Sequence, residues 1–189
     1  MEYIESQSFE KIIYTGNEFQ IAEYENCKFT NCDFSNINLS NMVFIDCTFH
    51  SCNLSSAKLN KTAFRNIKFI DCKMLGLHLE NCNTFLLEMS FQNCNLNLST
   101  FYRLKIKKSK FINSTLHEVD FSESDLTDSL FDNCDFRNAI FDNTILEKAD
   151  LRSSYNYTID PESNYIKKAK FSMDGIAGLL TKYDIEIEN

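Results

Sequence analysis

Glycine and proline are scarce in this chain of 189 residues, which has four glycines and one proline. No segment is rich in either residue, so the sequence offers no flexible linker and suits a single domain. No apolar run is long enough to span a bilayer, which takes about 20 residues. Residues 1–5 lack the basic and apolar regions of a signal peptide, so we expect a cytoplasmic protein with no membrane partner.

Recognisable metal and phosphate motifs are also missing. The chain has eight cysteines, but no two of them form a C-x-x-C pair, which argues against a zinc ribbon. A glycine-rich loop that could cradle phosphate is absent as well. We therefore expect no metal and no cofactor.

A large apolar residue recurs every five positions along nearly the whole chain. A helix repeats every 3.6 residues and a strand every 2, so neither explains this period. A short extended segment followed by a corner, repeated many times, explains it, and the sequence therefore predicts a solenoid. The period falls at Phe9, Tyr14, Phe19, Tyr24, Phe29, Phe34, Leu39, Phe44, Phe49, Leu54, Leu59, Phe64, Phe69, Met74 and Leu79 and then, after a slip of two residues, at Leu86, Phe91, Leu96, Phe101, Ile106, Phe111, Leu116, Phe121, Leu126, Phe131, Phe136, Phe141, Leu146 and Leu151.

A smaller side chain usually lies two residues before each large one. Residues i−2 and i point the same way in an extended chain, so both are predicted to face inward. The other three positions carry mainly Asn, Asp, Ser, Lys and Thr, which suit corners and water. Seven cysteines occupy the smaller inward position and are interpreted as core residues, namely Cys27, Cys32, Cys47, Cys52, Cys72, Cys94 and Cys134.

Residues 34–40 (FSNINLS) and 149–152 (ADLR) resemble the pentapeptide-repeat family, whose loose consensus is A(D/N)Lxx. The resemblance covers residues 9–151. It implies an all-β fold, a right-handed quadrilateral β-helix with four pentapeptides in each coil. In that arrangement His50, His78 and His117 lie on three different sides, so they form neither a metal site nor a catalytic triad. We therefore predict that the protein is not an enzyme.

Within that family, residues 14–16, 26–35 and 44–49 resemble the Qnr-type quinolone-resistance proteins and their MfpA-like relatives, as do residues 75–79 and 178–185. The resemblance implies binding to a bacterial type II topoisomerase, DNA gyrase or topoisomerase IV, by imitation of duplex DNA. It also implies a homodimer formed through the C-terminal element. The long loops that some of these relatives carry are absent.

The pattern divides the chain into three parts. Residues 1–8 are expected to cap the first coil, residues 9–151 to form the β-helix with the slip at 80–85, and residues 152–189 to form a C-terminal cap and dimerisation element. A solenoid needs its open apolar end covered. We expect a short capping helix at 174–182, started by Ser172 or Asp174, and a short strand near Ile185 and Ile187. The predicted cap and dimer residues are Ile176, Leu179, Leu180, Tyr183 and Ile185.

Negative charge is concentrated near the C-terminal end of the repeat. Residues 116–151 hold ten acidic and two basic residues, a formal charge of −8 that equals the charge of the whole chain. B-DNA carries one charge per ~1.7 Å of axis, so rigidly spaced carboxylates could occupy a basic channel built for DNA. The predicted partner-binding residues are Glu118, Asp120, Glu123, Asp125, Asp128, Asp132, Asp135, Asp142, Glu147 and Asp150.

The acidic residues have two explanations, since Asp and Asn also suit outward repeat positions whatever the protein binds. Two functional hypotheses follow. The first is a non-enzymatic DNA mimic that modulates a topoisomerase or protects it from quinolones or toxins. The alternative is a rigid interaction scaffold with an unrelated partner. A basic cluster at 103–110 has little aromatic company, so we expect no direct nucleic-acid binding and interpret it as a solvated edge or as a partner of an acidic coil.

Overall fold

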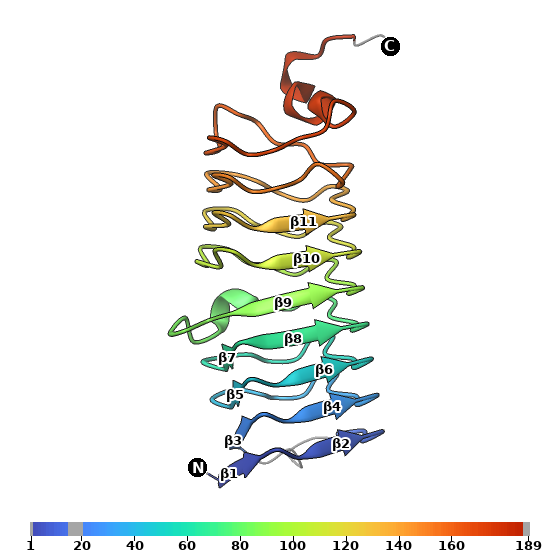
Figure 1. The fold of residues 1–189 in the computed structure, drawn as a ribbon, viewed down its shortest axis with the longest axis vertical. Helices are drawn as coiled ribbons and strands as arrows, with labels where there is room; N and C mark the ends of the chain where they lie inside the picture. The colour runs from blue at the N-terminus through green and yellow to red at the C-terminus, as the bar shows by residue number, and fades with distance from the viewer. Residues whose placement is uncertain (1, 15–20, 187–189) are drawn as a thin grey trace.

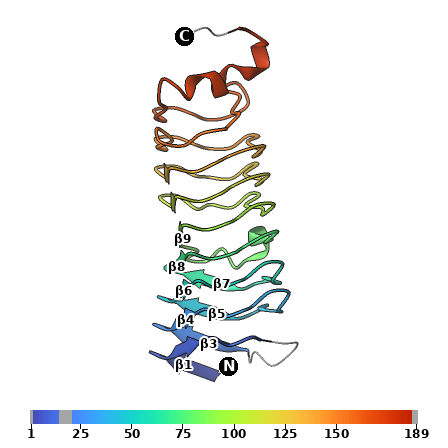
Figure 2. The ribbon, with the colours of Figure 1, turned by 90° about the vertical axis from the view of Figure 1, so that its right-hand side faces the viewer.

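The structure is a computed structural model that describes residues 2–14 and 21–186. The chain winds in stacked coils from the N-terminus at one end of a rod to the C-terminus at the other (Figures 1 and 2). This confirms the predicted all-β parallel solenoid. Phe19 and Ile187 lie outside the described residues.

Short parallel strands line two sides of the rod. One sheet has the order β1-β3-β5-β7 and the other has the order β11-β10-β9-β8-β6-β4-β2. Isolated parallel bridges such as Asp33 to Asn53 and Thr100 to Asp120 join the coils along the other two sides. The strands are β1 (Glu2–Glu5), β2 (Ser8–Glu10), β3 (Ala22–Glu25), β4 (Lys28–Thr30), β5 (Val43–Ile45), β6 (Thr48–His50), β7 (Ala63–Arg65), β8 (Ile67–Ile70), β9 (Met89–Gln92), β10 (Lys110–Ile112) and β11 (Leu130–Asp132).

The core is a set of side-chain columns that run along the rod. In the longer sheet, seven phenylalanines stack in direct succession, and the centroids of neighbouring rings lie 4.7 to 5.4 Å apart. Rings from adjacent sides of the same coil meet edge to face, as Phe91 does with Phe101 at 5.9 Å. Both arrangements are favourable for aromatic pairs. The stacked residues are Phe9, Phe29, Phe49, Phe69, Phe91, Phe111 and Phe131.

Asparagine is the most frequent corner residue in the described part of a chain with so few glycines. The second residue after most of the large inward residues has a positive φ, for example Asn36 at 60° and Asn113 at 49°. Asparagine enters this left-handed region more readily than other residues with a Cβ. Gly76 occupies the same place with a φ of 62°. Leu98, with a φ of 63°, is an unusual residue for it and is 60% exposed.

The register slip produces a bulge, and one sequence prediction there is wrong. Leu86 was predicted to face inward, but it is 65% exposed with a φ of 57°. Leu79–Asn81 forms the 3-10 turn η1, and the two extra residues push the following segment outward. Leu87 instead packs against the core. Phe85 is 64% exposed and lies beneath the Arg65 guanidinium, 5.5 Å from its ring centroid.

The ladder extends beyond the predicted repeat at both ends. Residues 1–8 were expected to cap the first coil, but β1 pairs in parallel with β3 and so forms one side of that coil. At the other end, Asp150 bridges to Lys170, beyond the expected limit at residue 151. Backbone pairing therefore continues where the apolar period fades.

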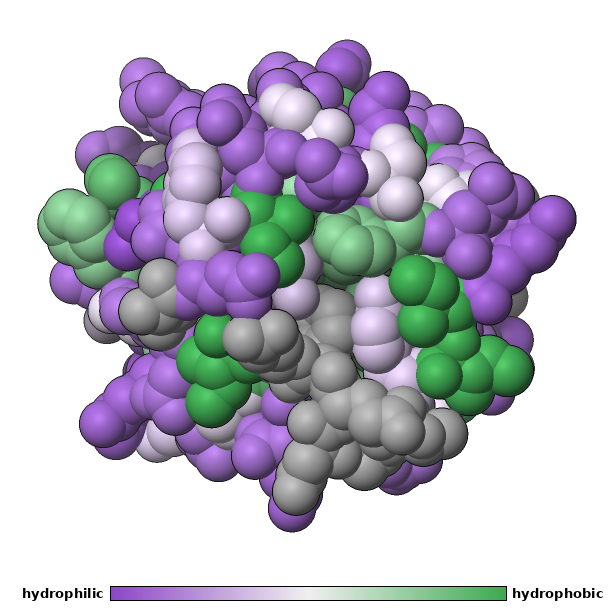
Figure 3. All heavy atoms as spheres, turned by 90° about the horizontal axis from the view of Figure 1, so that it is seen from below, coloured by the Kyte–Doolittle hydropathy of each residue, from purple (hydrophilic) through white to green (hydrophobic). Residues whose placement is uncertain are grey.

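The N-terminal end of the rod exposes apolar side chains. Seen from below, hydrophobic residues gather near the middle of this end within a hydrophilic rim (Figure 3). Ile4, Phe9 and Tyr14 are only partly buried here and pack on the core above them. In the described part of the chain, no helix has both the length and the apolar character needed to cross a membrane.

Replacing Phe111 with alanine should destabilise the protein by about 3–5 kcal/mol, because it removes a fully buried ring that is stacked on both sides in the phenylalanine column. Replacing Asn113 with glycine should change stability little, since its positive φ suits glycine. Thermal and denaturant unfolding measure both variants. Equal losses for the two would contradict the assignment of inward and outward positions.

Candidate partner-binding surface and C-terminal cap

The ten predicted acidic residues lie on every side of the rod rather than on one face. Asp150 follows the side of β11, Asp135 the next side, Asp120 the third and Asp125 the fourth. Asp125 and Asp135 are each only 8% exposed, whereas Asp128, Asp132 and Asp142 are exposed. The acids therefore form a belt around the last coils.

Four of the ten carboxylates are neutralised by ion pairs within the chain. Glu123 contacts Arg103 at 2.7 Å, and Asp125 contacts Lys107 at 3.0 Å. This confirms, for Arg103 and Lys107, the interpretation of the basic cluster as a partner of an acidic coil. Asp135 lies 3.9 Å from the Arg137 guanidinium and 2.8 Å from the His117 ring.

Asp150 is the most strongly paired carboxylate of the belt. It contacts Arg152 at 2.8 Å and Lys170 at 3.5 Å. The hydrogen bond from Arg152 lowers the pKa of Asp150 to about 2, although partial burial opposes the shift. Asp150 is therefore ionised throughout the physiological range, but its charge is not free for a partner.

Two carboxylates of the belt are held ionised despite their burial. Burial raises the pKa of Asp125, but hydrogen bonds from Thr127 and Lys107 outweigh it and the net shift is downward. For Asp135, hydrogen bonds from Asn156 and His117 likewise outweigh burial and lower the pKa. Both carboxylates are bonded within the rod and are not available to a partner.

The other six carboxylates form no ion pair with any residue that the structure describes. Asp120 accepts a hydrogen bond from the Ser122 backbone at 2.8 Å, and Asp132 accepts one from the Ser153 hydroxyl at 2.7 Å. Neither bond cancels the charge. The unpaired set, here named the free acidic belt, is Glu118, Asp120, Asp128, Asp132, Asp142 and Glu147.

The histidines and cysteines lie in separate structural settings. His50 pairs with Asp71, His78 with Glu80 and His117 with Asp135. Within residues 2–14 and 21–186, no three His, Cys, Asp or Glu side chains converge as a metal site would require. The eight cysteines are all buried and unbonded to one another, and burial raises the pKa of Cys134 to about 11. They act as small core residues, as predicted.

The C-terminal cap consists of two short 3-10 turns rather than the single helix expected at 174–182. They are η2 (Ile176–Leu179) and η3 (Thr181–Tyr183), and the Ser172 hydroxyl accepts a hydrogen bond from the Gly175 backbone at 3.1 Å. Gly175 and Gly178 both disfavour a continuous α-helix. Ile185 is not in a strand.

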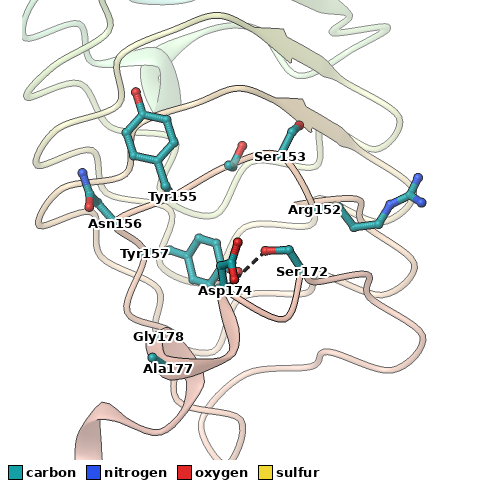
Figure 4. A pocket seen from close by; sticks show the side chains of 11 residues that line it. Arg152, Ser153, Tyr155, Asn156, Tyr157, Ser172, Asp174, Ala177 and Gly178 are labelled. Carbon is teal, nitrogen blue, oxygen red and sulfur yellow. Dashed lines mark hydrogen bonds between the residues drawn. The ribbon is translucent and has the colours of Figure 1, made fainter. Parts of the chain in front are cut away.

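Gly175 and Gly178 lie where the cap meets Tyr157, and Figure 4 labels Gly178 and Tyr157 there. A Cβ on Gly178 would lie 2.3 Å from the Tyr157 carbonyl oxygen, and one on Gly175 would lie 1.9 Å from the Tyr157 hydroxyl. The Gly178 carbonyl accepts a backbone hydrogen bond from Ile159 at 3.0 Å. Residues 152–157 and the cap also enclose a pocket of about 460 Å³.

Polar contacts fasten the outer part of the cap. Lys182 contacts Asp160 at 2.8 Å and Glu162 at 2.6 Å, and the Tyr183 hydroxyl donates to Glu162 at 2.9 Å. The pKa of Lys182 is raised because its hydrogen bonds to these carboxylates outweigh its desolvation.

The predicted cap and dimer residues divide into two groups. Leu179 packs against the core and Leu180 is half-buried. Ile176, Tyr183 and Ile185 remain 40%, 52% and 55% exposed. One group therefore closes the end of the rod, and the other leaves an apolar surface on the cap.

Replacing Gly178 with alanine should loosen the cap by about 1–3 kcal/mol, since the new Cβ would collide with the Tyr157 backbone. Limited proteolysis should then cut the cap faster, while the β-helix keeps its circular dichroism. Ala177→Gly, on the exposed side of η2, is the matched control. Unchanged cleavage in Gly178→Ala would show that the contact with Tyr157 does not hold the cap.

Comparison with known proteins identifies the architecture. Residues 17–84 and 84–155 match the family model described as a pentapeptide repeat region. HetL, a pentapeptide repeat protein involved in heterocyst differentiation regulation from the cyanobacterium Nostoc sp. strain PCC 7120, aligns with a TM-score of 0.72 at 15% identity, over 92% of this chain and 89% of HetL. Trypsin-treated QnrB1, a plasmid-mediated fluoroquinolone resistance protein, aligns at 22% identity with a TM-score of 0.48, over 98% and 100% of the two chains.

No protein of curated function matches the sequence. The alignment with HetL establishes a shared fold. The family match covers most of the described coils, and the chain therefore belongs to the pentapeptide-repeat family.

Proposed function

We propose that this protein is a non-enzymatic DNA mimic that binds a bacterial type II topoisomerase, DNA gyrase or topoisomerase IV. Binding would modulate the enzyme or protect it from quinolones or toxins, and it places the protein in the cytoplasm with its partner. The observation that carries the proposal is the free acidic belt. Its carboxylates project from a rigid rod and are not neutralised within it.

The density of free charge on the belt is close to that of DNA. Residues 116–151 fill slightly less than two coils, and stacked strands are about 4.8 Å apart, so they occupy roughly 9 Å of the rod. Six free carboxylates over that length give about one charge per 1.5 Å, compared with ~1.7 Å for B-DNA. A basic channel shaped for a duplex would attract such a surface over a long range.

The rigidity of the belt adds to the argument. Glu118 and Asp128 lie at positive-φ corners whose backbone amides donate to Arg137 and Glu147 of the next coil, at 2.9 Å each. Backbone hydrogen bonds of this kind fix the position of the Cα atom that carries each acidic side chain. A partner would therefore lose little entropy in ordering the surface it contacts.

The test is a supercoiling assay with purified gyrase, with and without ciprofloxacin. Neutralising four belt residues by Glu118→Gln, Asp120→Asn, Asp128→Asn and Asp142→Asn should raise the concentration needed for inhibition or protection about tenfold. A control variant neutralises four acids outside the belt by Glu2→Gln, Glu5→Gln, Glu23→Gln and Glu88→Gln. It should behave like the wild type.

Wild-type protein that neither inhibits nor protects gyrase or topoisomerase IV would refute the proposal and leave the scaffold alternative. Equal effects of the two charge variants would show that overall charge, rather than the belt, drives binding.

We further propose that two copies pair through the exposed apolar surface of the cap. Ile176, Tyr183 and Ile185 are exposed on the cap, and so is Met173, which is 83% exposed. Two-fold pairing would join two belts into one longer acidic rod.

Light scattering should show a dimer for the wild type and a monomer for Ile176→Asp combined with Ile185→Asp. Leu98→Asp, on the side of the rod, should remain dimeric, and a monomeric wild type would contradict the proposal.

A further inference from the structure

Lysines and hydroxyl residues alternate along one side of the rod. In the longer sheet, the outward residue of each strand lies directly opposite the outward residue of the next, from β2 to β10. Three lysines occupy every second place in this row, which we name the lysine column. The row is Ser8, Lys28, Thr48, Lys68, Ser90 and Lys110.

The three lysines are exposed, and none forms an ion pair with a residue in the described part of the chain. The basic residues Arg103 and Lys107 instead form ion pairs with Glu123 and Asp125. Lys28, Lys68 and Lys110 therefore carry positive charge with no partner, on a chain whose net charge is −8. Such a row is a candidate surface for an anionic ligand.

The short residues between the lysines leave space on this side. Lys68, Ser90 and Lys110 line two adjoining depressions, of about 360 and 210 Å³, on either side of the row. Ile70 and Ile112 form part of the wall of the smaller one, and Glu88 is at the edge of the larger one. The side chain at the centre, Ser90, is half-buried.

The spacing of the lysines selects the shape of the ligand. Two rungs of about 4.8 Å separate successive lysines, which gives ~9.6 Å. A polyproline II chain has three residues per turn and rises 3.1 Å per residue, so every third side chain returns to the same face after ~9.3 Å. Across all three lysines the two repeats differ by only about 0.6 Å.

We propose that the lysine column binds an acidic, disordered polypeptide segment in the polyproline II conformation, with an acidic residue at every third position. Polyproline II is a major conformer of disordered chains, so little reorganisation is needed. Its backbone groups form no internal hydrogen bonds, and the Thr48 hydroxyl lies between the lysines to meet them. The Ser90 hydroxyl donates to the Ile67 carbonyl at 3.4 Å, so its oxygen serves as an acceptor for the peptide. This inference stands apart from topoisomerase binding, which uses the opposite charge.

Other anionic chains fit the column less well. An extended strand returns to the same face every ~6.7 Å, and multiples of that distance miss the second lysine. An α-helix returns after seven residues, or ~10.5 Å, which drifts by nearly 2 Å over the column. Each strand of B-DNA winds around its axis, so its phosphates leave a straight row of lysines after the first contact.

The column also has a defined end. The next two places in the same row are Leu130 and Asp150, where the charge vanishes and then changes sign. Leu130 offers no charge contact to an acidic segment, and the Asp150 carboxylate is already paired with Arg152 and Lys170. The site is limited to the three lysines between β4 and β10.

The test is fluorescence anisotropy at low ionic strength with a labelled peptide of four Glu-Pro-Pro repeats. A control peptide has the same composition but places its four glutamates in succession. The full-length protein should bind the periodic peptide several-fold more tightly than the control. The combined substitution Lys28→Gln, Lys68→Gln and Lys110→Gln should raise the Kd about tenfold, because it removes three exposed charge contacts.

A second variant, Lys58→Gln with Lys73→Gln and Lys105→Gln, loses the same charge from the other sides of the rod and should bind like the wild type. No binding, equal loss in both variants, or equal affinity for both peptides would overturn the proposal. A single-stranded oligothymidylate that binds more tightly and is released by the same three substitutions would assign the column to nucleic acid instead. Neither acidic-belt neutralisation nor a negative gyrase assay bears on these outcomes.

Discussion

The stacking of each bulky side chain on its counterpart one coil away is the interaction on which the molecule depends. A single pentapeptide cannot bury its large residue, since it is too short to fold back over it. The next coil supplies the missing cover, as Phe111 shows by stacking on Phe91 and Phe131 at 4.9 Å each. Stability is therefore a property of neighbouring coils, and it is weakest where the stack ends. At the N-terminal end, the first coil is therefore only half-buried. At the C-terminal end, the last coil is covered by a cap that depends on two glycines.

The corners are the second requirement of this architecture. Turning four times per coil demands a left-handed residue at almost every repeat, and in the described residues the chain meets that demand with Asn, Lys, Asp, Ser and Glu far more often than with glycine, of which Gly76 is the example. The same positions also present side chains outward. Glu118 and Asp128 belong to this class, so part of the acidic belt grows directly out of the corner geometry. The residues that form the corners therefore also supply part of the surface charge.

The sequence predicts the core well because that information is local. A period of five identifies which side chains face inward, and the buried positions from Phe29 to Leu151 follow it. The prediction fails at Leu86, where continuing the period after the slip required knowing how the two extra residues leave the coil. It also missed the two 3-10 turns of the cap, since their form depends on the contact with Tyr157, which lies 18 residues or more from Gly175.

The partner-binding surface was predictable in composition and not in detail. Counting charges located the acidic segment, but the pairing of Glu123 with Arg103 joins residues one coil apart and becomes visible only in three dimensions. Such pairing reduces ten candidate carboxylates to six. The lysine column was not predicted from the sequence for the same reason. Its members lie 40 or more residues apart and align only when the coils are stacked.

Hydrogen exchange measured along the chain tests the stacked-coil account most directly. The amides of Phe34 and Phe121 donate to Asn53 and Ile140 of the next coil, at 2.7 and 2.9 Å. The account predicts that peptides containing them exchange far more slowly than the exposed bulge around Phe85 and Leu86. Exchange of Phe121 as fast as the bulge would contradict it.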